Sequence, residues 1–546
     1  MFNSTPKLAP PVNEPVLGYL PGSPERASLQ KRAQQMMNET IEVPLIVGGK
    51  EVRTGNFAEH RSPHDHSKVL ARYHTASADV VNQAVEASQK AWHDWAHTAP
   101  QDRIAVFMRM AELLAGPWRD TLNASTMAGQ SKTCHQAEID SACELIDFYR
   151  FNAYFALHQI YPDQPLSVPG VWNMVEYRPL EGFVFAVTPF NFTSIAGNLP
   201  TAPALMGNTV LWKPASSSLL SNYYLMKLFE AAGMPPGVIN FVPGRGSQVG
   251  NPVIASPHLT GIHFTGSTPV FQSMWKDIGA NIATYKTYPR IVGETGGKDF
   301  IFAHASCNAD QLVAAAIRGA WEFQGQKCSA LSRMYVPRSR WGEIKEKLLA
   351  ELATVKMGDP VNDFSNFIGA VIDEGAFNDI TGYIDYAKAT PGAEIIAGGT
   401  YDKSRGWFIT PTVIECEDPH FKTMEEEIFG PVLSVFVYDD AKLDEALTLC
   451  DTTSPYALTG GIFAEDRYAI RSMMNRLRFA SGNFYINDKP TGAVVGQQPF
   501  GGSRASGTND KAGSVLNLMR WTSMRTIKEN LLPPSNYRYG FLGSSS

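Results

Sequence analysis

A cysteine and a glutamate lie in settings that suit covalent catalysis. Cys328 lies in WEFQGQKCSA (321–330), where a nearby glycine leaves the backbone free of bulk, so that a carbonyl compound could reach the thiol and the cysteine N–H could face the oxyanion formed. Glu294 lies in GETGGKD (293–299), ahead of two glycines, where a carboxylate could activate water. Each has a plainer interpretation when taken alone, because an isolated cysteine is commonly a small core residue and an isolated glutamate a solvated charge.

An asparagine could add a hydrogen-bond donor to such a site. Asn191 lies in VTPFNFT (187–193), directly after an apolar, strand-like run. A side-chain amide at the end of a strand can donate to an oxyanion, and the alternative for this residue is a turn former.

Two segments could hold a nucleotide. Lys213 ends the apolar run in LWKPASS (211–217) and could reach a ribose or a phosphate, although a lysine on the surface at a strand end is the plainer interpretation. In GIHFTGSTPVF (261–271) a strand stops at Gly266 and Ser267 and turns into a helix, whose free N–H groups could bind a pyrophosphate.

A third segment pairs an acid with an aromatic residue. If MEEEIFGPV (424–432) is extended, Glu427 and Phe429 lie on one side of a strand, because side chains alternate with a period of two. An acid and a ring in that arrangement could bind a ribose and a nicotinamide. A glutamate-rich loop that enters a strand is the alternative.

Composition excludes several classes of protein. The 546 residues carry a formal net charge of -6 without a block of Lys or Arg, so a nucleic-acid partner is not expected. No apolar stretch approaches the roughly 18 residues of a membrane span. The six cysteines form no CxxC pair, which is typical of a reducing compartment. HRSPHDHS (60–67) contains three histidines, but it lacks partners at metal-ligand spacing, so we expect a solvated loop and no metal.

The elements that would position these residues follow from periodicity. A proline-rich arm and a short polar helix (26–40) precede a hairpin at VPLIVGGKEV (43–52) and helices at 79–97 and 102–116. Short, nearly continuous apolar runs separated by helical segments then predict buried parallel strands. These runs lie at 182–190, 208–214, 238–244, 261–267, 299–305, 332–338, 408–415 and 433–440. The pattern predicts two α/β domains with a cleft between them.

In their order and spacing, these segments resemble the aldehyde dehydrogenase superfamily. Its signatures are an Asn after an aromatic residue, a Lys-Pro step, F-T-G-S, E-x-G-G-K and G-Q-x-C, and the resemblance covers essentially the whole chain. It implies an α/β fold of two doubly wound parallel-sheet domains with a small β oligomerisation element. The implied units are an NAD(P)-binding domain (1–162 and 180–296), a catalytic domain (297–515), and an oligomerisation hairpin and tail (163–179 and 516–546).

The same resemblance assigns roles to individual residues. It implies that Cys328 is the nucleophile, Glu294 the general base and Asn191 an oxyanion donor. The residues implied to bind the cofactor are Thr188, Pro189, Phe190, Lys213, Ser216, Gly266, Ser267, Thr268, Pro269, Val270, Glu427 and Phe429. Many relatives carry an acid where this chain has Ser216, and that acid repels a 2′-phosphate. Because Ser216 offers no such repulsion, NADP is less strongly excluded, but NAD remains the expected cofactor.

Within the superfamily, the chain resembles the Δ1-pyrroline-5-carboxylate dehydrogenases. The segments that carry this resemblance are NEPV, GSPER, AEID, ELIDFYRFNA, GQKCSA and ASGNFYINDKPTGAVVGQQPFGGSRASGTNDKAG. The implied reaction is the NAD(P)-dependent oxidation of L-glutamate γ-semialdehyde to L-glutamate in proline catabolism, through a cysteine thioester.

The implied substrate carries an α-carboxylate and an α-ammonium. The resemblance assigns the carboxylate to Ser329 and to the backbone N–H groups of Gly492 and Ala493, and it assigns the ammonium to Glu144. Phe500 would pack against the substrate methylenes. Without the resemblance, Asp140, Glu144 and Asp147 would be interpreted as a solvated acidic helix face.

Two other functions stay open at this point. A dehydrogenase of another semialdehyde, such as succinate semialdehyde, would need no ammonium anchor, and a catalytically silent binding or structural homologue would need no chemistry. Retention of Asn191, Glu294, Cys328 and Glu427 argues against the silent homologue.

Assembly and location are expectations of the same kind. PLSVPGVWNMVEYRPLEG (165–182) is typical of a hairpin and, with the apolar C-terminal tail, implies a homodimer or higher homo-oligomer, while the terminal GSSS (543–546) is expected to be disordered. The first residues lack the Arg-rich character of a transit peptide. We therefore expect a cytoplasmic enzyme for the chain as written, or a mitochondrial matrix enzyme if it is a processed eukaryotic form.

Overall fold

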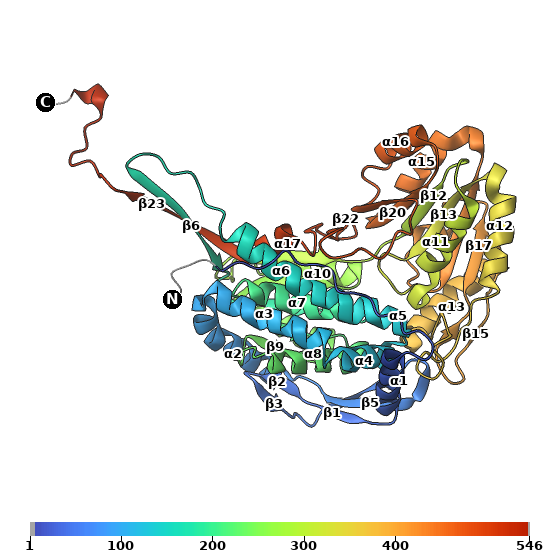
Figure 1. Cartoon of the computed structure of the whole chain (residues 1–546), viewed down its shortest axis with the longest axis horizontal. Coiled ribbons are helices and arrows are strands. Elements are labelled where there is room, and N and C mark those ends of the chain that lie inside the picture. Colours follow the sequence, from blue (N-terminus) through green and yellow to red (C-terminus); the bar gives the residue numbers. More distant parts are fainter. Residues whose placement is uncertain (1–5, 544–546) are drawn as a thin grey trace.

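Two seven-stranded sheets, one in each half of the chain, form the framework of the molecule. The computed structural model describes residues 6–543, so Ser544–Ser546 of the terminal GSSS lie outside the described residues. The N-terminal half appears in blue and green and the second half in yellow and orange (Figure 1), and a long ribbon extends away from both.

The first half begins with an arm, a helix and short strands. Its elements are α1 (Pro24–Met37), β1 (Ile41–Val43), β2 (Leu45–Val47), β3 (Lys50–Val52), β4 (Phe57–Ser62), β5 (Asp65–His74), α2 (Ala78–His97), α3 (Pro100–Ala115), α4 (Arg119–Gln130), α5 (Cys134–Ala137), the π-helix η1 (Glu138–Cys143), α6 (Glu144–Phe155) and η2 (Ala156–Ile160). The expected hairpin is confirmed as β2 and β3, with the turn glycines Gly48 and Gly49 at positive φ, and both expected helices are confirmed as α2 and α3.

The first large sheet has the order β11-β10-β7-β8-β9-β2-β3. Its further elements are β7 (Phe183–Val187), α7 (Thr193–Leu205), β8 (Thr209–Lys213), η3 (Ser216–Ser218), α8 (Leu219–Ala231), β9 (Ile239–Phe241), α9 (Gly246–Ala255), β10 (Leu259–Thr265), α10 (Thr268–Ala280) and β11 (Arg290–Glu294). Strands β7, β8, β9 and β10 are parallel, as expected, and so is β11, which the apolar pattern did not predict. Alternate residues of β7 pack on opposite faces, Val184 with α3, α6, α7 and α8 and Phe185 with α2, α9 and α10, so the sheet is doubly wound.

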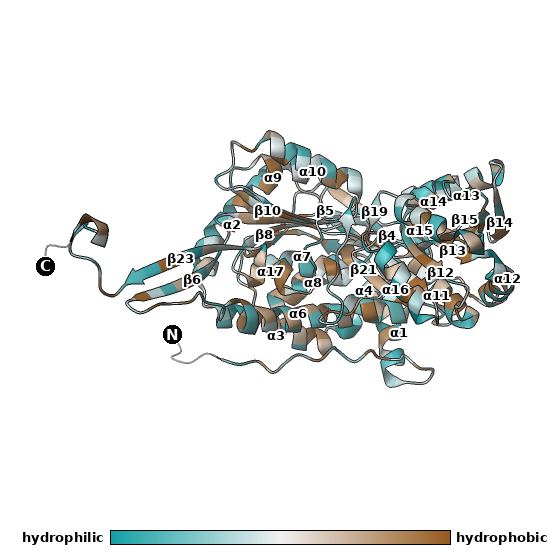
Figure 2. Ribbon diagram, turned by 90° about the horizontal axis from the view of Figure 1, so that it is seen from above, coloured by the Kyte–Doolittle hydropathy of each residue, from teal (hydrophilic) through white to brown (hydrophobic). Residues whose placement is uncertain are grey.

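The second large sheet has the order β14-β17-β18-β13-β12-β20-β21. Its elements are β12 (Asp299–Ala303), α11 (Ala309–Trp321), η4 (Glu322–Gly325), β13 (Leu331–Pro337), α12 (Arg338–Leu352), α13 (Glu374–Ala389), β14 (Ala393–Ala397), β17 (Thr412–Cys416), α14 (Lys422–Glu425), β18 (Val432–Tyr438), η5 (Asp440–Lys442), α15 (Leu443–Thr452), β20 (Thr459–Phe463), α16 (Arg467–Arg476) and β21 (Asn483–Ile486). Helices α11 and α12 cover one face, and α13, α15 and α16 cover the other. In Figure 2 the hydrophobic colour follows inner strands such as β8, β10 and β13.

Small two-stranded pieces complete the chain. They are β15 (Tyr401–Asp402) with β16 (Phe408–Ile409), β19 (Tyr456–Ala457) with β22 (Ser503–Arg504), and β6 (Val171–Pro179) with β23 (Thr522–Asn530), together with α17 (Val515–Met519) and η6 (Gly540–Leu542). Within residues 6–543, no helix has the length and apolarity needed to cross a membrane.

The expected hairpin at 165–182 is wrong as a local pair of strands. Its second arm is β6, but the partner of β6 is the distant β23, with Trp172 opposite Glu529. The first arm holds Pro165 and Pro169, which lack the backbone N–H that strand pairing needs. The Gln164 side chain just before it contacts β6 instead, because its amide donates to the Val175 carbonyl and accepts from the Val175 N–H. The two-stranded ribbon of β6 and β23 therefore joins segments that are far apart in the chain.

The histidine-rich segment 60–67 is not a solvated loop. His60 and His64 are buried, and burial lowers the pKa of each imidazole to about 4. His60 is bonded to the Gly129 carbonyl at 3.1 Å, and His64 to the Ser131 hydroxyl at 3.2 Å. His66 is half-buried and contacts the second half, where its Nε2 lies 3.0 Å from the Lys403 carbonyl. His66 therefore helps to join the two halves, while His60 and the Ser131 contact of His64 lie within the first half.

Candidate active site

Four predicted site residues follow the carboxyl ends of parallel strands at one edge of the first sheet. Asn191 comes after β7, Lys213 ends β8, Ser267 comes after β10 and Glu294 ends β11. The register places Val187 opposite Lys213 and Thr265 opposite Glu294, so these ends are level. Ligands of open α/β sheets bind at this edge, because the chain turns there into helix N-termini.

The predicted nucleophile lies in an unusual turn between α11 and β13. Phe323, Gln324 and Gly325 have φ values of 52°, 55° and 66°, three left-handed residues in succession. At Gly325 the close approach of the chain requires glycine, because a Cβ would lie 2.3 Å from the carbonyl oxygen of Gly430. This turn brings Cys328 from the end of α11 into the interior, where its side chain is buried.

Two glutamines hold this turn. The Gln324 amide donates to Ala370 O at 2.6 Å and accepts from Gly369 N at 3.0 Å. The Gln326 side chain accepts from Ile372 N at 2.8 Å. Sequence reasoning missed both roles. The Gly-Gln signature marks them in the sequence but does not indicate which backbone groups they bind.

The Asn191 amide joins the first half to this turn. Asn191 Nδ2 donates to the Gln326 carbonyl at 3.0 Å, and Oδ1 has no hydrogen-bond partner. An amide nitrogen carries two hydrogens, so one can hold the turn while the other serves a ligand beside Cys328. This geometry suits an oxyanion donor.

Burial and neighbouring carboxylates shape the titration of the thiol and of Glu294. Burial, together with Glu294 and Asp299, raises the pKa of the Cys328 thiol well above its ordinary value. Burial also raises the pKa of Glu294 to about 7, while the Lys511 ammonium opposes this rise. Glu294 Oε1 is shielded from solvent and has no hydrogen-bond partner. A carboxyl group in that state can accept a proton near neutral pH.

The two glycines after Glu294 make room for Glu427. A Cβ on Gly296 would lie 2.1 Å from Glu427 Oε2, and the Gly297 N–H donates to Glu427 Oε1 at 2.9 Å. Burial raises the pKa of Glu427 to about 7. Of the two interpretations of this segment, the structure has the glutamate-rich loop that enters a strand, because no strand lies between α14 and β18 and Phe429 has a φ of 56°. The loop nonetheless carries both residues to the edge of the first sheet, where the Phe429 ring lies 5.9 Å from that of Phe190.

The same edge fits a dinucleotide. Thr268, Pro269 and Val270 form the first turn of α10, and Ser267, its N-cap residue, makes no side-chain cap, so the first N–H groups are open to an anion. Nearby, Thr188 accepts a hydrogen bond from Trp212, and Lys213 donates weakly to the Pro214 carbonyl at 3.3 Å. Ser216 is exposed beyond β8. The predicted cofactor residues therefore come together around an exposed helix N-terminus with a lysine beside it.

A cavity of about 260 Å³ opens beside Cys328. The structure brings the predicted substrate residues together in its wall, namely Glu144, Ser329, Gly492, Ala493 and Phe500. Ser329 shares a hydrogen bond of 2.7 Å with Thr491. Gly492 has a φ of 93°, which an L side chain rarely adopts, and this conformation turns the loop at the cavity rim. Glu294 lies instead on an adjoining cavity, which shares Glu144 and Phe500 with the first.

The acids at 140, 144 and 147 do not form a solvated helix face. Asp140 and Asp147 are buried, and Asp140 lies in the π-helix η1, which interrupts the regular spacing. Burial, together with Asp140, raises the pKa of Glu144 to about 8, and Ser194 donates a hydrogen bond to it. Burial also acts on Asp140, but Lys132 at 2.6 Å, Lys327 and Lys489 together outweigh it and hold the pKa of Asp140 below its usual value. Among the described residues, Asp140 thus has lysine partners at salt-bridge distance, whereas Glu144 and Asp147 have none.

Sequence reasoning also missed a set of charged residues around the cavity. Lys327 lies 3.6 Å from Asp140 and 3.5 Å from Glu322, and Lys489 lies 3.6 Å from Glu322. Glu14 also lines the cavity, together with the uncharged Asn13. Lys327 adjoins Cys328 in sequence and could have been noticed there, whereas Asp140 and Lys489 lie far along the chain from their partners Lys327 and Glu322.

Comparisons with known proteins agree with this geometry. A model of the aldehyde dehydrogenase family matches residues 51–527. The chain is 54% identical to Delta-1-pyrroline-5-carboxylate dehydrogenase, mitochondrial, of Dictyostelium discoideum, over 97% of this chain and 96% of that protein. It is 47% identical to the protein of that name from Homo sapiens, over 97% and 94%. The Delta-pyrroline-5-carboxylate dehydrogenase from Mycobacterium tuberculosis, solved bound with NAD, superimposes with a TM-score of 0.96 at 50% identity over 100% of both chains.

Proposed function

The chain belongs to the aldehyde dehydrogenase family, and from this premise we propose that it oxidises L-glutamate γ-semialdehyde to L-glutamate in proline catabolism with NAD. This semialdehyde is the open form of Δ1-pyrroline-5-carboxylate. The observation that carries the proposal is the cavity that Cys328 shares with Glu144 and with the turn at Gly492 and Ala493. The cavity can thus bind an ammonium and a carboxylate while it presents an aldehyde to the thiol.

The chemistry begins at Cys328. The raised pKa keeps the resting thiol protonated, so a base must take its proton as sulfur adds to the aldehyde carbon. Glu294, the carboxylate with the largest effect on that thiol, is suited to accept it. The oxyanion of the thiohemiacetal is bound by the Asn191 amide and the Cys328 backbone N–H.

NAD supplies the hydride acceptor when it is bound. The residues that would hold it are Lys213 and Ser216 at the ribose, Gly266 to Val270 at the pyrophosphate, and Glu427 with Phe429 at the nicotinamide end, with Thr188, Pro189 and Phe190 beside them. Glu294 must release the thiol proton to solvent before the hydrolysis step. It then deprotonates the water that attacks the thioester on Cys328, and the Cys328 thiolate is the leaving group. Ser329, Gly492 and Ala493 hold the carboxylate, Glu144 holds the ammonium, and Phe500 packs against the methylenes.

A comparison of substrates tests this assignment. Steady-state kcat/KM is measured with NAD for glutamate γ-semialdehyde and for succinate semialdehyde, which has no ammonium. We expect a clear preference for the first, because Glu144 then gains its partner. Equal values would contradict the substrate assignment, and failure to form NADH with either would favour a silent homologue. Repeating the assay with NADP gives the cofactor preference that Ser216 leaves open.

The roles of the domains, the assembly and the compartment are part of the proposal. Residues 1–162 and 180–296 bind the cofactor, 297–515 carry the thiol, and 163–179 with 516–546 mediate a homodimer or higher homo-oligomer. Relatives named as mitochondrial and the six free, buried cysteines support a reducing compartment, either the mitochondrial matrix or the cytoplasm.

A further inference from the structure

The N-terminal arm (residues 8–20) forms one wall of the substrate cavity. It has no regular structure, and the chain after N passes along α6 toward α1 in both views (Figures 1 and 2). Leu17 N donates to Glu138 Oε1 at 2.9 Å, and the Tyr19 hydroxyl donates to Glu138 Oε2 at 2.8 Å. These bonds fasten the arm to η1, so its residues at the cavity are held in place.

Asn13 in this arm bridges two separate parts of the cavity wall. Its Nδ2 donates to Asp147 Oδ2 on α6 at 2.8 Å and to the Val495 carbonyl at 2.8 Å. Its Oδ1 accepts from Gln497 Nε2 at 2.9 Å. One side chain thus makes one bond to helix α6 and two to the loop that follows β21.

The two parts that Asn13 joins carry the two ends of the substrate site. Asp147 lies about one helical turn after Glu144, on the same face of α6. Val495 lies just after Gly492 and Ala493 in the loop between Pro490 and Phe500, which contains no strand or helix. A change in the bridge therefore changes the distance between the ammonium site and the carboxylate site.

The loop between Pro490 and Phe500 makes few other hydrogen bonds to the rest of the protein near Val495. Thr491 shares its hydroxyl hydrogen bond with Ser329, and Gly496 lies against the Phe151 ring, where a Cβ would be 2.1 Å from the ring. The contact with Phe151 packs the loop on α6 but adds no hydrogen bond. Asn13 supplies hydrogen bonds to the loop, at Val495 and Gln497.

The arm also occupies Asp147, which could otherwise compete for the ammonium. Asp147 Oδ2 accepts from Asn13, and Oδ1 accepts from the backbone N–H of Glu14 at 2.7 Å. The Glu14 carboxylate forms salt bridges with Arg119 and Arg150, each at 2.6 Å. Glu144 is left as the acid that can turn to a ligand.

We propose that Asn13 is a positioning residue that fixes the loop of Gly492 and Ala493 relative to Glu144, and so sets the selectivity for an aldehyde bearing both an α-carboxylate and an α-ammonium. This inference rests on the proposed function. Asn13 does not touch the reacting atoms, so its loss weakens binding of this substrate without changing the chemical step.

Kinetics of Asn13→Ala with two aldehydes test the inference. For glutamate γ-semialdehyde we expect KM to rise about three- to tenfold, the size of one or two lost hydrogen bonds, with kcat within about twofold. For propanal, which has neither charged group, kcat/KM should stay within about twofold. Asn38→Ala is the matched control, because Asn38 is an exposed asparagine that caps α1 through Gln34 O. It should change none of these values.

A second variant approaches the bridge from the loop. Gln497→Ala removes the exposed side chain that donates to Asn13, so it leaves the core intact and should raise KM for the semialdehyde by a smaller factor. It should add little when combined with Asn13→Ala, because both remove the same contact. Additive effects in the double variant would contradict the bridge.

Two outcomes would overturn the inference. One is an unchanged KM for glutamate γ-semialdehyde in Asn13→Ala, and the other is an equal loss of kcat/KM for propanal, which would indicate general damage. Failure of the proposed function looks different, because the unmodified enzyme would then show no preference for glutamate γ-semialdehyde over propanal.

Discussion

At the scale of single residues, the environment of Glu294 matches the work proposed for it. Burial raises its pKa to about 7, and its Oε1 has no protein partner. A general base works best when its pKa lies near the operating pH, since it is then ionised often enough and still holds a proton well. The proposed water therefore meets a carboxylate that no other group of the protein occupies.

Replacing this carboxylate separates the two halves of the reaction. In Glu294→Gln we expect one NADH per site in a rapid burst and then a stall, because the amide cannot deprotonate water to open the thioester. Stopped-flow absorbance measures the burst. Glu465→Gln, which changes an exposed glutamate, should turn over normally. Sustained turnover by Glu294→Gln would remove Glu294 from the role of deacylating base.

The pH profile tests the same residue without removing it. Because the pKa of Glu294 is raised to about 7, its ionised fraction, and with it the deacylation rate, should increase as pH rises through 7 and level off above that. The Lys511 ammonium lowers this pKa, so Lys511→Met should move the rising limb to higher pH, while Lys511→Arg should keep it in place. An identical profile for Lys511→Met and the unmodified enzyme would contradict this coupling.

The residues themselves were predictable to different degrees. Cys328, Glu294 and Asn191 are recognisable from local motifs because each is set by its immediate neighbours. Asn13 and Lys489 are not, because the roles seen here depend on contacts across the fold, Asn13 with Val495 and Lys489 with Glu322. For these residues the sequence shows the side chain but does not indicate which distant residue it contacts.

At the scale of elements, the left-handed turn before Cys328 determines where the thiol lies. Gly325→Ala should place a Cβ 2.3 Å from Gly430 O and force a side chain into positive φ, which costs about 1–2 kcal/mol before the steric overlap is counted. We expect a lower melting temperature and a large loss of kcat. Thermal unfolding and steady-state assays measure the two effects.

A glycine elsewhere in the second half provides the control. Gly342 lies exposed in α12, and a Cβ there meets nothing within 4 Å. Gly342→Ala should leave activity unchanged and stabilise the fold by up to about 1 kcal/mol, since alanine is the better helix former. Similar stability and activity in both variants would show that the turn at Gly325 tolerates a side chain.

The elements were predicted well where apolar runs are unbroken. Strands β7, β8 and β10 match their expected ranges closely, whereas 408–415 is divided into β16 and β17 around Pro411. Strand β20, an inner strand of the second sheet, was missed because Thr-Gly-Gly hides its pattern, yet Gly460 is needed where a Cβ would lie 2.3 Å from Phe300. Close packing at a glycine leaves no apolar signal in the sequence.

At the scale of the whole molecule, the site depends on contact between the halves. Asn191 from the first half bonds the Gln326 carbonyl of the second, and Ser131 Oγ accepts from Ala370 N at 3.0 Å. The turn at His64 adds further contacts, with Trp407 N donating to the Pro63 carbonyl at 3.1 Å. The thiol and its oxyanion donor are thus set in register by the packing of one half on the other.

The ribbon of β6 and β23 supports the proposed assembly. It extends away from the body (Figure 1), and it exposes Trp172 by 54% and Met524 by 56%, with Leu532 exposed by 82% just beyond it. A two-stranded ribbon is marginally stable alone in water, so these apolar side chains are expected to pack against a second copy. Static light scattering at micromolar concentration should then give at least twice the mass of one chain.

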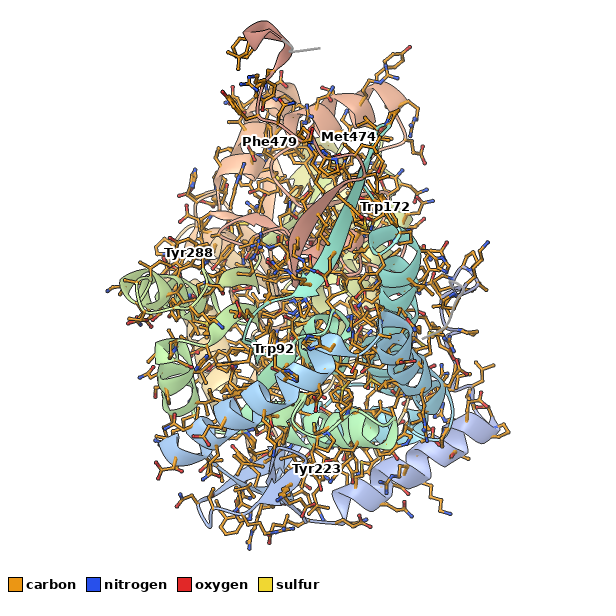
Figure 3. All side chains as sticks on the ribbon, turned by 90° about the vertical axis from the view of Figure 1, so that its left-hand side faces the viewer. Trp92, Trp172, Tyr223, Tyr288, Met474 and Phe479 are labelled. Atoms are coloured by element: carbon orange, nitrogen blue, oxygen red, sulfur yellow. The ribbon has the colours of Figure 1, made fainter. Side chains whose placement is uncertain are left out.

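Charged substitutions on the ribbon should break this assembly. A double variant, Trp172→Asp with Met524→Asp, would bury two carboxylates in the subunit contact without removing core residues, so the mass should fall toward that of one chain. Met474→Asp is the matched control, because Met474 is an exposed methionine on α16 in the other half of the molecule (Figure 3 labels Met474 and Trp172). Its mass should equal that of the unmodified enzyme. A monomeric unmodified enzyme, or a double variant that keeps its full mass, would mean that the ribbon does not join subunits.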